Sequence, residues 1–136
     1  MELIDELEVA RWVKSKAEAA TGLDAYLDLI PETHPLPAIR FTFQLRHDVY
    51  TVEAHAPMSR FQVLVVVTAD NDLTSMGTLR AHEKALHDGL HRAAGVVGEC
   101  NVLSCVRLGP FTMTEGEAAH LYRHAGGTYQ LQARPA

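Results

Sequence analysis

The stretch Arg60–Ala94 decides the fold: its apolar run Phe61–Val67 (FQVLVVV) gives way within a few residues to a helical pattern. A run this short, rich in β-branched residues and apolar at consecutive positions, predicts a strand buried on both faces, with helical cover on at least one. The following junction, Thr68–Asp72, carries neither a phosphate-binding glycine loop nor a nucleophile elbow. The stretch predicts a sheet covered by helices and directs the search for function to surfaces and assembly.

Length and composition bound the answer further. A chain of 136 residues is predicted to form one domain, residues 1–136, with a core that needs no disulfide or metal. Hydrophobic residues make up 47% and charged residues 21%, which is typical of globular proteins. The net charge is −5 and the 12 Lys and Arg residues are scattered, which argues against a protein that grips a nucleic-acid backbone. No apolar stretch approaches the ~20 residues that cross a bilayer.

Acidic residues in Met1–Glu8 are atypical of a secretory signal, so we expect a soluble helix there. Cys100 and Cys105, if both lie on one extended segment, are ~17 Å apart, which exceeds disulfide reach. Their odd separation predicts that they point to opposite faces of a strand. We expect two reduced thiols in a reducing compartment.

In the first half of the chain we expect a helix from about Glu2 to Ala20, ended by Gly22. Trp12 lies off its apolar stripe and either reaches the core edge or contacts a neighbouring subunit. Leu23–Pro37 is Pro-rich and irregular, with a short strand possible at Ala25–Leu29.

Strict alternation in Ile39–Leu45 predicts a half-buried strand. Arg46–Asp48 is interpreted as a three-residue turn that leads into a second strand, Val49–Ala54. Pro57 then precedes the strand Arg60–Ala69.

A second helix is predicted after the candidate N-caps Asp70, Asp72, Thr74 and Ser75, with a buried stripe of Leu79, Leu86, Leu90 and Ala93 and an end at Gly95. Asn101–Leu108 is predicted to be another strand.

Gly109-Pro110 is predicted to break the chain, and Phe111–Glu117 to form a polar surface connection. This connection is either a simple surface loop, which is favoured, or the loop of this chain that contacts a partner. The last segment, His120–Ala133, alternates on both sides of Gly126-Gly127. The two glycines are either a tight hairpin turn or a bulge within one long bent strand, and we favour the bulge. The predicted fold class is α/β in the broad sense, more closely α+β: a mixed, mainly antiparallel sheet of about four or five strands with two main helices packed on it.

The segment His82–His87 (HEKALH) nearly matches the zinc-protease helix signature. That chemistry needs two histidines four residues apart, about 40° from eclipsed, whereas five residues place them roughly 140° apart. His87 and His91 have the right spacing, but no third ligand accompanies them, and Glu83 is expected on a partly buried face. We interpret these residues as a solvated helix face, and keep a small intracellular metal protein or enzyme that uses His82, His87 and His91 as an alternative.

His120 and His124 flank Tyr122, and with Glu115 and Glu117 they suggest an acid and base pair. Ser59, Ser75 and Ser104 lack elbow glycines, and Ser104 is expected in a strand. A reaction needs a nucleophile, an anion site or paired carboxylates at fixed separation, and the sequence assembles none of these. We expect no enzyme and name no catalytic, cofactor-binding or metal-binding residue and no cofactor.

The order of elements resembles the tail terminator proteins of long-tailed bacteriophages, the family that includes the lambda tail terminator. The likeness is carried by Arg60–Val66 leading to Leu79–Leu86, and by the ending Leu121–Leu131. It covers nearly the whole chain in pattern, although no signature motif accompanies it.

The resemblance implies a structural virion protein made in the host bacterial cytoplasm and located at the head-proximal end of the tail. There it would form a hexameric ring that caps the tail tube, ends tube polymerisation and presents the head-tail joining surface. Its implied partners are copies of itself, the tail tube protein and a head-completion or connector protein, while DNA passes through the ring without specific binding. A gene transfer agent particle would use such a protein in the same way. A neighbouring neck or head-closure connector is the alternative within this class.

Overall fold

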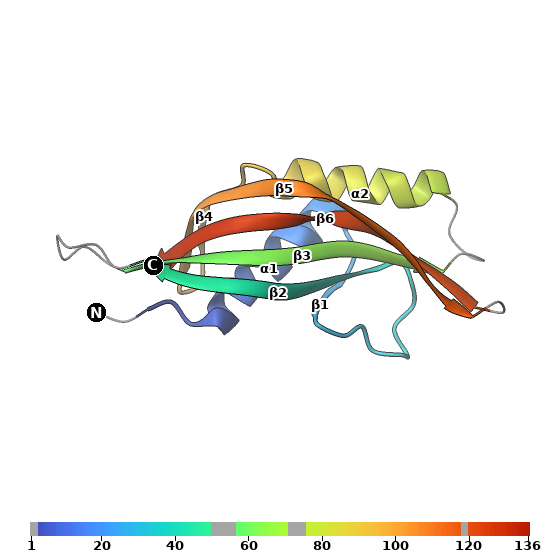
Figure 1. Cartoon of the computed structure of the whole chain (residues 1–136), viewed down its shortest axis with the longest axis horizontal. Coiled ribbons are helices and arrows are strands. Elements are labelled where there is room, and N and C mark those ends of the chain that lie inside the picture. Colours follow the sequence, from blue (N-terminus) through green and yellow to red (C-terminus); the bar gives the residue numbers. More distant parts are fainter. Residues whose placement is uncertain (1–2, 50–56, 71–75, 118–119) are drawn as a thin grey trace.

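The computed structural model describes residues 3–49, 57–70, 76–117 and 120–136, apart from the side chains of Glu117 and His120. Two helices and six strands follow one another along the chain (Figure 1). They are α1 (Glu6–Thr21), β1 (Ala25–Leu27), β2 (Ala38–Val49), β3 (Met58–Asp70), α2 (Met76–Leu90), β4 (Gly95–Val97), β5 (Cys100–Glu117) and β6 (His120–Pro135).

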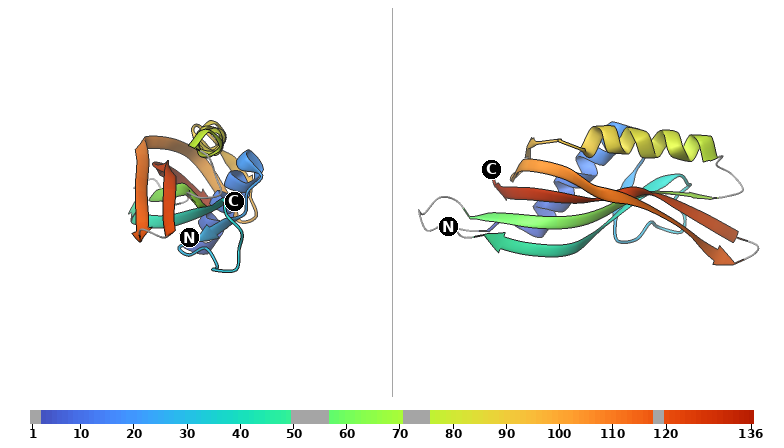
Figure 2. Two further views of the ribbon diagram at one scale, coloured as in Figure 1. Left: turned by 90° about the vertical axis from the view of Figure 1, so that its right-hand side faces the viewer. Right: turned by 45° about the horizontal axis from the view of Figure 1, so that its top comes forward.

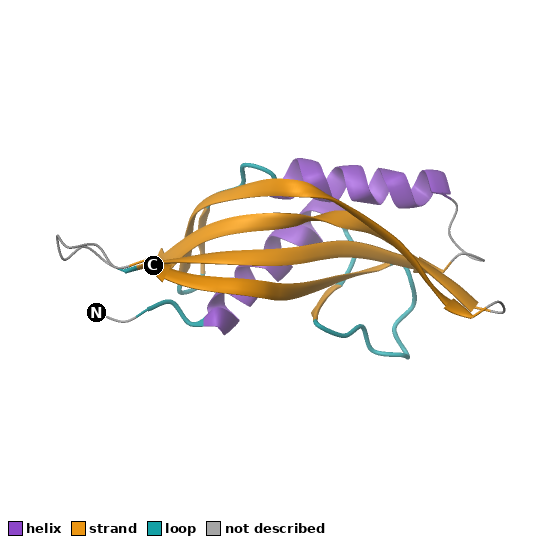
Figure 3. Ribbon diagram, viewed as in Figure 1, coloured by secondary structure: helices purple, strands orange, loops and turns teal. Residues whose placement is uncertain are grey.

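The strands form one sheet in the order β1-β2-β3-β6-β5-β4, in which β1 pairs with β2 in parallel and all other neighbours are antiparallel. The sheet is curled rather than flat (Figure 2). Figure 1 looks onto the face opposite α1, which crosses behind the strands. Figure 3 shows α2 along the side of the sheet formed by β5 and β6, where it packs against both strands and α1. The predicted α+β class is confirmed. The described sheet has six strands rather than four or five, because the short strands β1 and β4, of three residues each, extend it at its two edges.

The apolar run that decided the fold is the central part of β3, between β2 and β6. Burial alternates from Met58 to Leu64 and is continuous from Val65 to Ala69. Residues 63, 65 and 67 face the helices and join the main core, so the predicted helical cover is confirmed. On the other face, the segment after β1 lies over Thr68, where residues 29–32 and Thr68 line one pocket.

Helix α1 begins at Glu6, later than predicted, because Asp5 caps it by accepting a hydrogen bond from the Leu7 N–H at 2.9 Å. Gly22 ends it at a φ of 74°. Trp12 is fully buried and donates from Nε1 to the Gly95 carbonyl at 3.1 Å, which confirms the core reading of this residue.

The second helix, α2, has three of the four residues of the predicted stripe, since Leu79, Leu86 and Leu90 are buried, whereas Ala93 follows the helix and packs against the core partly buried. It ends at Leu90 rather than Gly95, because Arg92 adopts a φ of 67° and donates its N–H to the Cys105 carbonyl. Asp70 ends β3, and the other three candidate N-caps lie outside the described residues.

The predicted turn at Arg46–Asp48 is wrong, because these residues continue β2 and pair with β3. Asp48 secures this extension: its Oδ1 accepts hydrogen bonds from Ser59 Oγ at 2.6 Å and Arg46 Nε at 3.0 Å. The same bonds hold the pKa of Asp48 below its usual value, with Ser59 the larger cause. The predicted strand Val49–Ala54 contributes only Val49 to β2, and residues 50–54 lie outside the described part of the chain.

The predicted break at Gly109-Pro110 and the polar connection Phe111–Glu117 are also wrong, because both belong to β5 and pair with β6. Proline is tolerated because no described strand pairs with the outer edge of β5 beyond Val102, so Pro110 removes no ladder hydrogen bond there.

Strand β6 runs unbroken through Gly126-Gly127, so the long-strand reading is confirmed and the hairpin reading is wrong. The predicted bulge at the glycines is wrong as well, because the register with β3 is regular there. The irregularities lie in β5 instead, between Val102 and Ser104 and between Arg107 and Gly109.

The two glycines serve close packing rather than a bulge. A Cβ on Gly126 would lie 2.0 Å from the Val65 carbonyl oxygen and 2.7 Å from the Val66 Cα. A Cβ on Gly127 would lie 2.5 Å from Arg107 Nε. The backbones of β3, β5 and β6 therefore crowd together at a point where a side chain has no room.

The first β5 bulge also corrects the prediction for the cysteines. An extra residue between Val102 and Ser104 resets the alternation, so Cys100 and Cys105 both face the core and both are free thiols. Burial raises the pKa of Cys100 to about 11 and that of Cys105 to about 12, mainly by desolvating the thiolate.

We predict that Gly126→Ala lowers the free energy of unfolding by about 3 kcal/mol or more, because its Cβ would meet rigid backbone of β3. Urea denaturation measures the change. Gly109→Ala is the matched control, since a Cβ there meets nothing within 4 Å. Equal effects of the two substitutions would show that the close approach of β6 to β3 does not limit stability.

We also predict that neither cysteine reacts with a thiol-specific reagent at pH 8 in the native protein, because the reactive thiolate is scarce and buried. Both should react within the mixing time in urea. Rapid labelling of one thiol in the folded protein would contradict the burial of that strand face.

Candidate functional site

The histidines of α2 do not form a metal site. His87 and His91 stack, with ring centroids 5.1 Å apart and planes at 17°. His91 Nδ1 accepts the Arg107 backbone N–H at 3.1 Å, so a neutral His91 carries its proton on Nε2 and offers no free lone pair. In the described part of the chain, no three His, Cys, Asp or Glu residues are placed to hold a metal ion.

Glu83 has a different partner, Arg107, that the sequence did not reveal. Arg107 Nη2 donates to Glu83 Oε1 and to the Gly126 carbonyl, both at 2.6 Å, and the guanidinium lies 6.0 Å from the centroid of the Tyr129 ring. The pair is largely shielded from solvent, and it ties α2 to the crowded point of the sheet. The acid in the zinc-like segment therefore has a structural role.

The suspected acid and base pair is formed in part. His124 Nε2 lies 2.6 Å from Glu115 Oε1, and His124 Nδ1 lies 2.8 Å from Thr68 Oγ1. Because a carboxylate only accepts, Nε2 donates to Glu115, and in the neutral ring Nδ1 accepts the Thr68 hydroxyl proton. The side chains of His120 and Glu117 lie outside the described part of the structure.

The order hydroxyl, imidazole, carboxylate is that of a hydrolase triad, yet its surroundings do not suit acyl transfer. Thr68 lines the pocket beneath residues 29–32, but it is only 6% exposed, it sits within the β3 ladder between Ala38 and His124, and its hydroxyl is bonded to His124, which indicates a structural role. The three side chains instead join β3, β6 and β5. Thr68 was missed because a threonine in an apolar strand is indistinguishable from a packing residue.

The other serines considered as candidates, where they are described, also occupy structural positions. Ser59 is buried and bonded to Asp48, and Ser104 lies in β5 as predicted. Ser75 lies outside the described residues.

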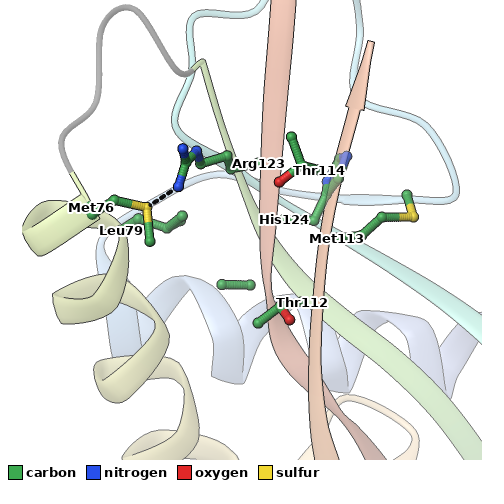
Figure 4. Close-up of a pocket in the computed structure, with 8 residues that line it drawn as sticks. Met76, Leu79, Thr112, Met113, Thr114, Arg123 and His124 are labelled. Atoms are coloured by element: carbon green, nitrogen blue, oxygen red, sulfur yellow. Dashed lines mark hydrogen bonds between the residues drawn. The ribbon is translucent and has the colours of Figure 1, made fainter.

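The far end of the β5–β6 hairpin forms an arm, which we define as residues 112–117 and 120–125. It projects past the start of β2, at the right of Figure 1. A pocket of about 390 Å³ lies between the arm and the first turn of α2 (Figure 4). Arg123 donates from Nη1 to Met76 Sδ across it, and Met113 is 38% exposed beside it. This open hollow is lined by apolar, polar and basic side chains, among them His124, whose ring is already bonded to Thr68 and Glu115.

Both outer edges of the sheet are only partly covered. Among the described strands, β1 pairs with β2 only at residues 39–41, and β4 pairs with β5 only at residues 100–102. Beyond these residues no described strand pairs with either edge, and apart from Cys105 and Arg107, which are bound by Arg92 and His91, the edges are available for pairing with a neighbouring chain. The candidate functional site of this chain is therefore a pair of surfaces at opposite edges, together with the arm.

No described helix is both long and apolar enough to cross a membrane. No protein-family model matches this chain, and no curated protein sequence matches it. The structure does match a solved one, a chain from the structure described as "Virion of native gene transfer agent (GTA) particle", with a TM-score of 0.60. The match covers 90% of this chain and 91% of that chain at 16% sequence identity, so this chain shares the fold of a protein in that virion.

Proposed function

We propose that this protein is a structural component of a phage-like or gene transfer agent virion, and that it caps the head-proximal end of the tail tube as a ring. The observation that carries the proposal is the fold match to a virion protein, because it spans nine-tenths of both chains. As a terminator, the ring would end tube polymerisation and present the surface that the head joins.

The two incompletely paired edges support a ring. A cyclic assembly needs two different patches on each subunit, which meet head to tail until the rotation closes. In this sheet β2 and β5 are separated by β3 and β6, so the open edges face in different directions. The fold also provides a projecting arm, which suits contact with a partner outside the ring.

The same fold match permits a neighbouring neck or head-closure connector, and the partner separates the two roles. A terminator binds the tail tube protein, whereas a connector binds a head protein. Co-purification with each candidate partner therefore tests the alternative directly.

We predict that the purified protein, alone or offered its tail tube protein, forms closed rings of six subunits seen end-on by negative-stain electron microscopy. Tubes assembled with it should be capped at one end and should stop growing. A subunit that stays monomeric and leaves tube length unchanged would contradict the terminator role.

We further predict that DNA of mixed sequence is not retained at low salt. The chain carries 17 acidic and 12 basic residues, so it lacks the surplus of cations that holds phosphates. A filter-binding or gel-shift measurement at about 20 mM salt gives the answer. Retention of DNA at micromolar protein concentrations would mean that DNA adheres to this protein instead of sliding past it.

A further inference from the structure

Two surfaces at opposite edges of the sheet are complementary in charge and both apolar. The first, the acidic groove, has a volume of about 250 Å³ beside β2. It is lined by Asp5, Glu6, Leu7, Leu27, Asp28 and Phe43. Half of these residues are acids, none is a base, and Leu7 remains 59% exposed.

Within the described residues, no cation forms an ion pair with the acids that line the groove. In the described structure, neither Glu6 nor Asp28 forms an ion pair, while Asp5 caps α1. Arg46 approaches the rim, where it donates to the Ile4 carbonyl, but its charge is matched by Asp48. The groove therefore presents negative charge around an apolar floor.

The second surface, the leucine ridge, lies on the outer part of β5. Leu103, Val106 and Leu108 are between 41% and 52% exposed, and each leucine stands at a bulge of the strand. Arg92 is exposed, and its backbone lies against the same edge of β5, where its N–H binds the Cys105 carbonyl. Arg92 forms no ion pair with a described residue. The acid Glu99 belongs to the β4–β5 turn, which precedes β5 and is therefore separated from Leu108 by the whole ridge.

We propose that the leucine ridge and Arg92 of one copy dock into the acidic groove of the next copy, and that this contact builds the ring. The occupant is a second copy because both halves of a matched pair, apolar and of opposite charge, are on the same chain at opposite edges. The inference rests on the proposed ring and adds which surfaces form it. Arg92 meets Glu6 and Asp28, while the ridge side chains cover Leu7 and Leu27.

Charge reversal tests the contact. Arg92→Glu makes the ridge acidic, and the double variant Glu6→Lys with Asp28→Lys makes the groove basic. Each variant alone should raise the concentration needed for assembly by at least about tenfold, because like charges meet. An equimolar mixture of the two should assemble again, since the acidic ridge of one fits the basic groove of the other and the remaining surfaces are also opposite in charge. Sedimentation velocity measures the mass of the assemblies that each variant and the mixture form, with and without the tail tube protein.

Matched controls carry the same charge changes elsewhere: Arg80→Glu on the exposed face of α2 for the ridge, and Glu32→Lys together with Asp88→Lys, both at exposed positions, for the groove. Both should assemble like the natural chain. Reversal variants that assemble normally would overturn the contact and leave the ring proposal standing. A natural chain that never forms rings, even with the tube, would overturn the ring itself.

A cysteine trap records the contact even when it is short-lived in free solution. Leu7→Cys and Val106→Cys introduced together should give a ladder of disulfide-linked chains under mild oxidation, because each copy then joins the next. Either substitution alone should give no species larger than a dimer, and the two buried native thiols should not take part. The absence of a ladder from the doubly substituted chain would also overturn the contact.

Discussion

The structure depends on one close approach, where the backbone of β6 at Gly126 lies against Val65 and Val66 of β3 with no room for a Cβ. At the same point the Arg107 side chain crosses Gly127 and binds the Gly126 carbonyl and Glu83. Glycine has no side chain that would clash at this point, and the Arg107 guanidinium, whose charge is matched by Glu83, fills the remaining space. The two strands can therefore approach each other closely here, within a sheet that is curled rather than flat.

This constraint reaches the helices and the surface together. Glu83 fixes α2 against the sheet, and Gly89 of α2 lies close to Ala20 of α1, where a Cβ on Gly89 would be 2.3 Å from the Ala20 Cβ. The bulges of β5 on either side of Arg107 increase the local twist and turn Leu103 and Leu108 toward solvent. The distortion that lets the core close thus also creates the apolar ridge on the outside.

The features that depend on the periodic spacing of apolar residues were predicted correctly from the sequence. The β3 strand, the α2 stripe, the end of α1 at Gly22 and the α+β class follow from apolar spacing and from glycine at a helix end. Errors arose where tertiary contacts override local signals. Arg46–Asp48 has turn-like residues but is held in β2 by Ser59. Gly109-Pro110 continues β5, which pairs there with β6 on one side and with no described strand on the other. The two cysteines were assigned to opposite faces because a bulge leaves no trace in a single sequence. The contacts of Arg107 and Thr68 were out of reach for a related reason, since they join residues distant along the chain.

Electrostatics also decides what kind of assembly these surfaces favour. In a two-fold symmetric dimer built on one edge, a groove would face a groove or a ridge would face a ridge, which sets Glu6 and Asp28 against their own copies, or Arg92 against Arg92. Like charges brought together without compensation weaken such pairs, whereas ridge to groove satisfies both charges at once. Because the two surfaces lie on opposite edges of a curled sheet, each head-to-tail contact adds a rotation in the same sense. A repeated rotation of this kind leads to a closed ring when its angle divides a full turn and to a filament otherwise. In the proposed ring, the curl of the sheet therefore contributes to the angle between neighbouring copies.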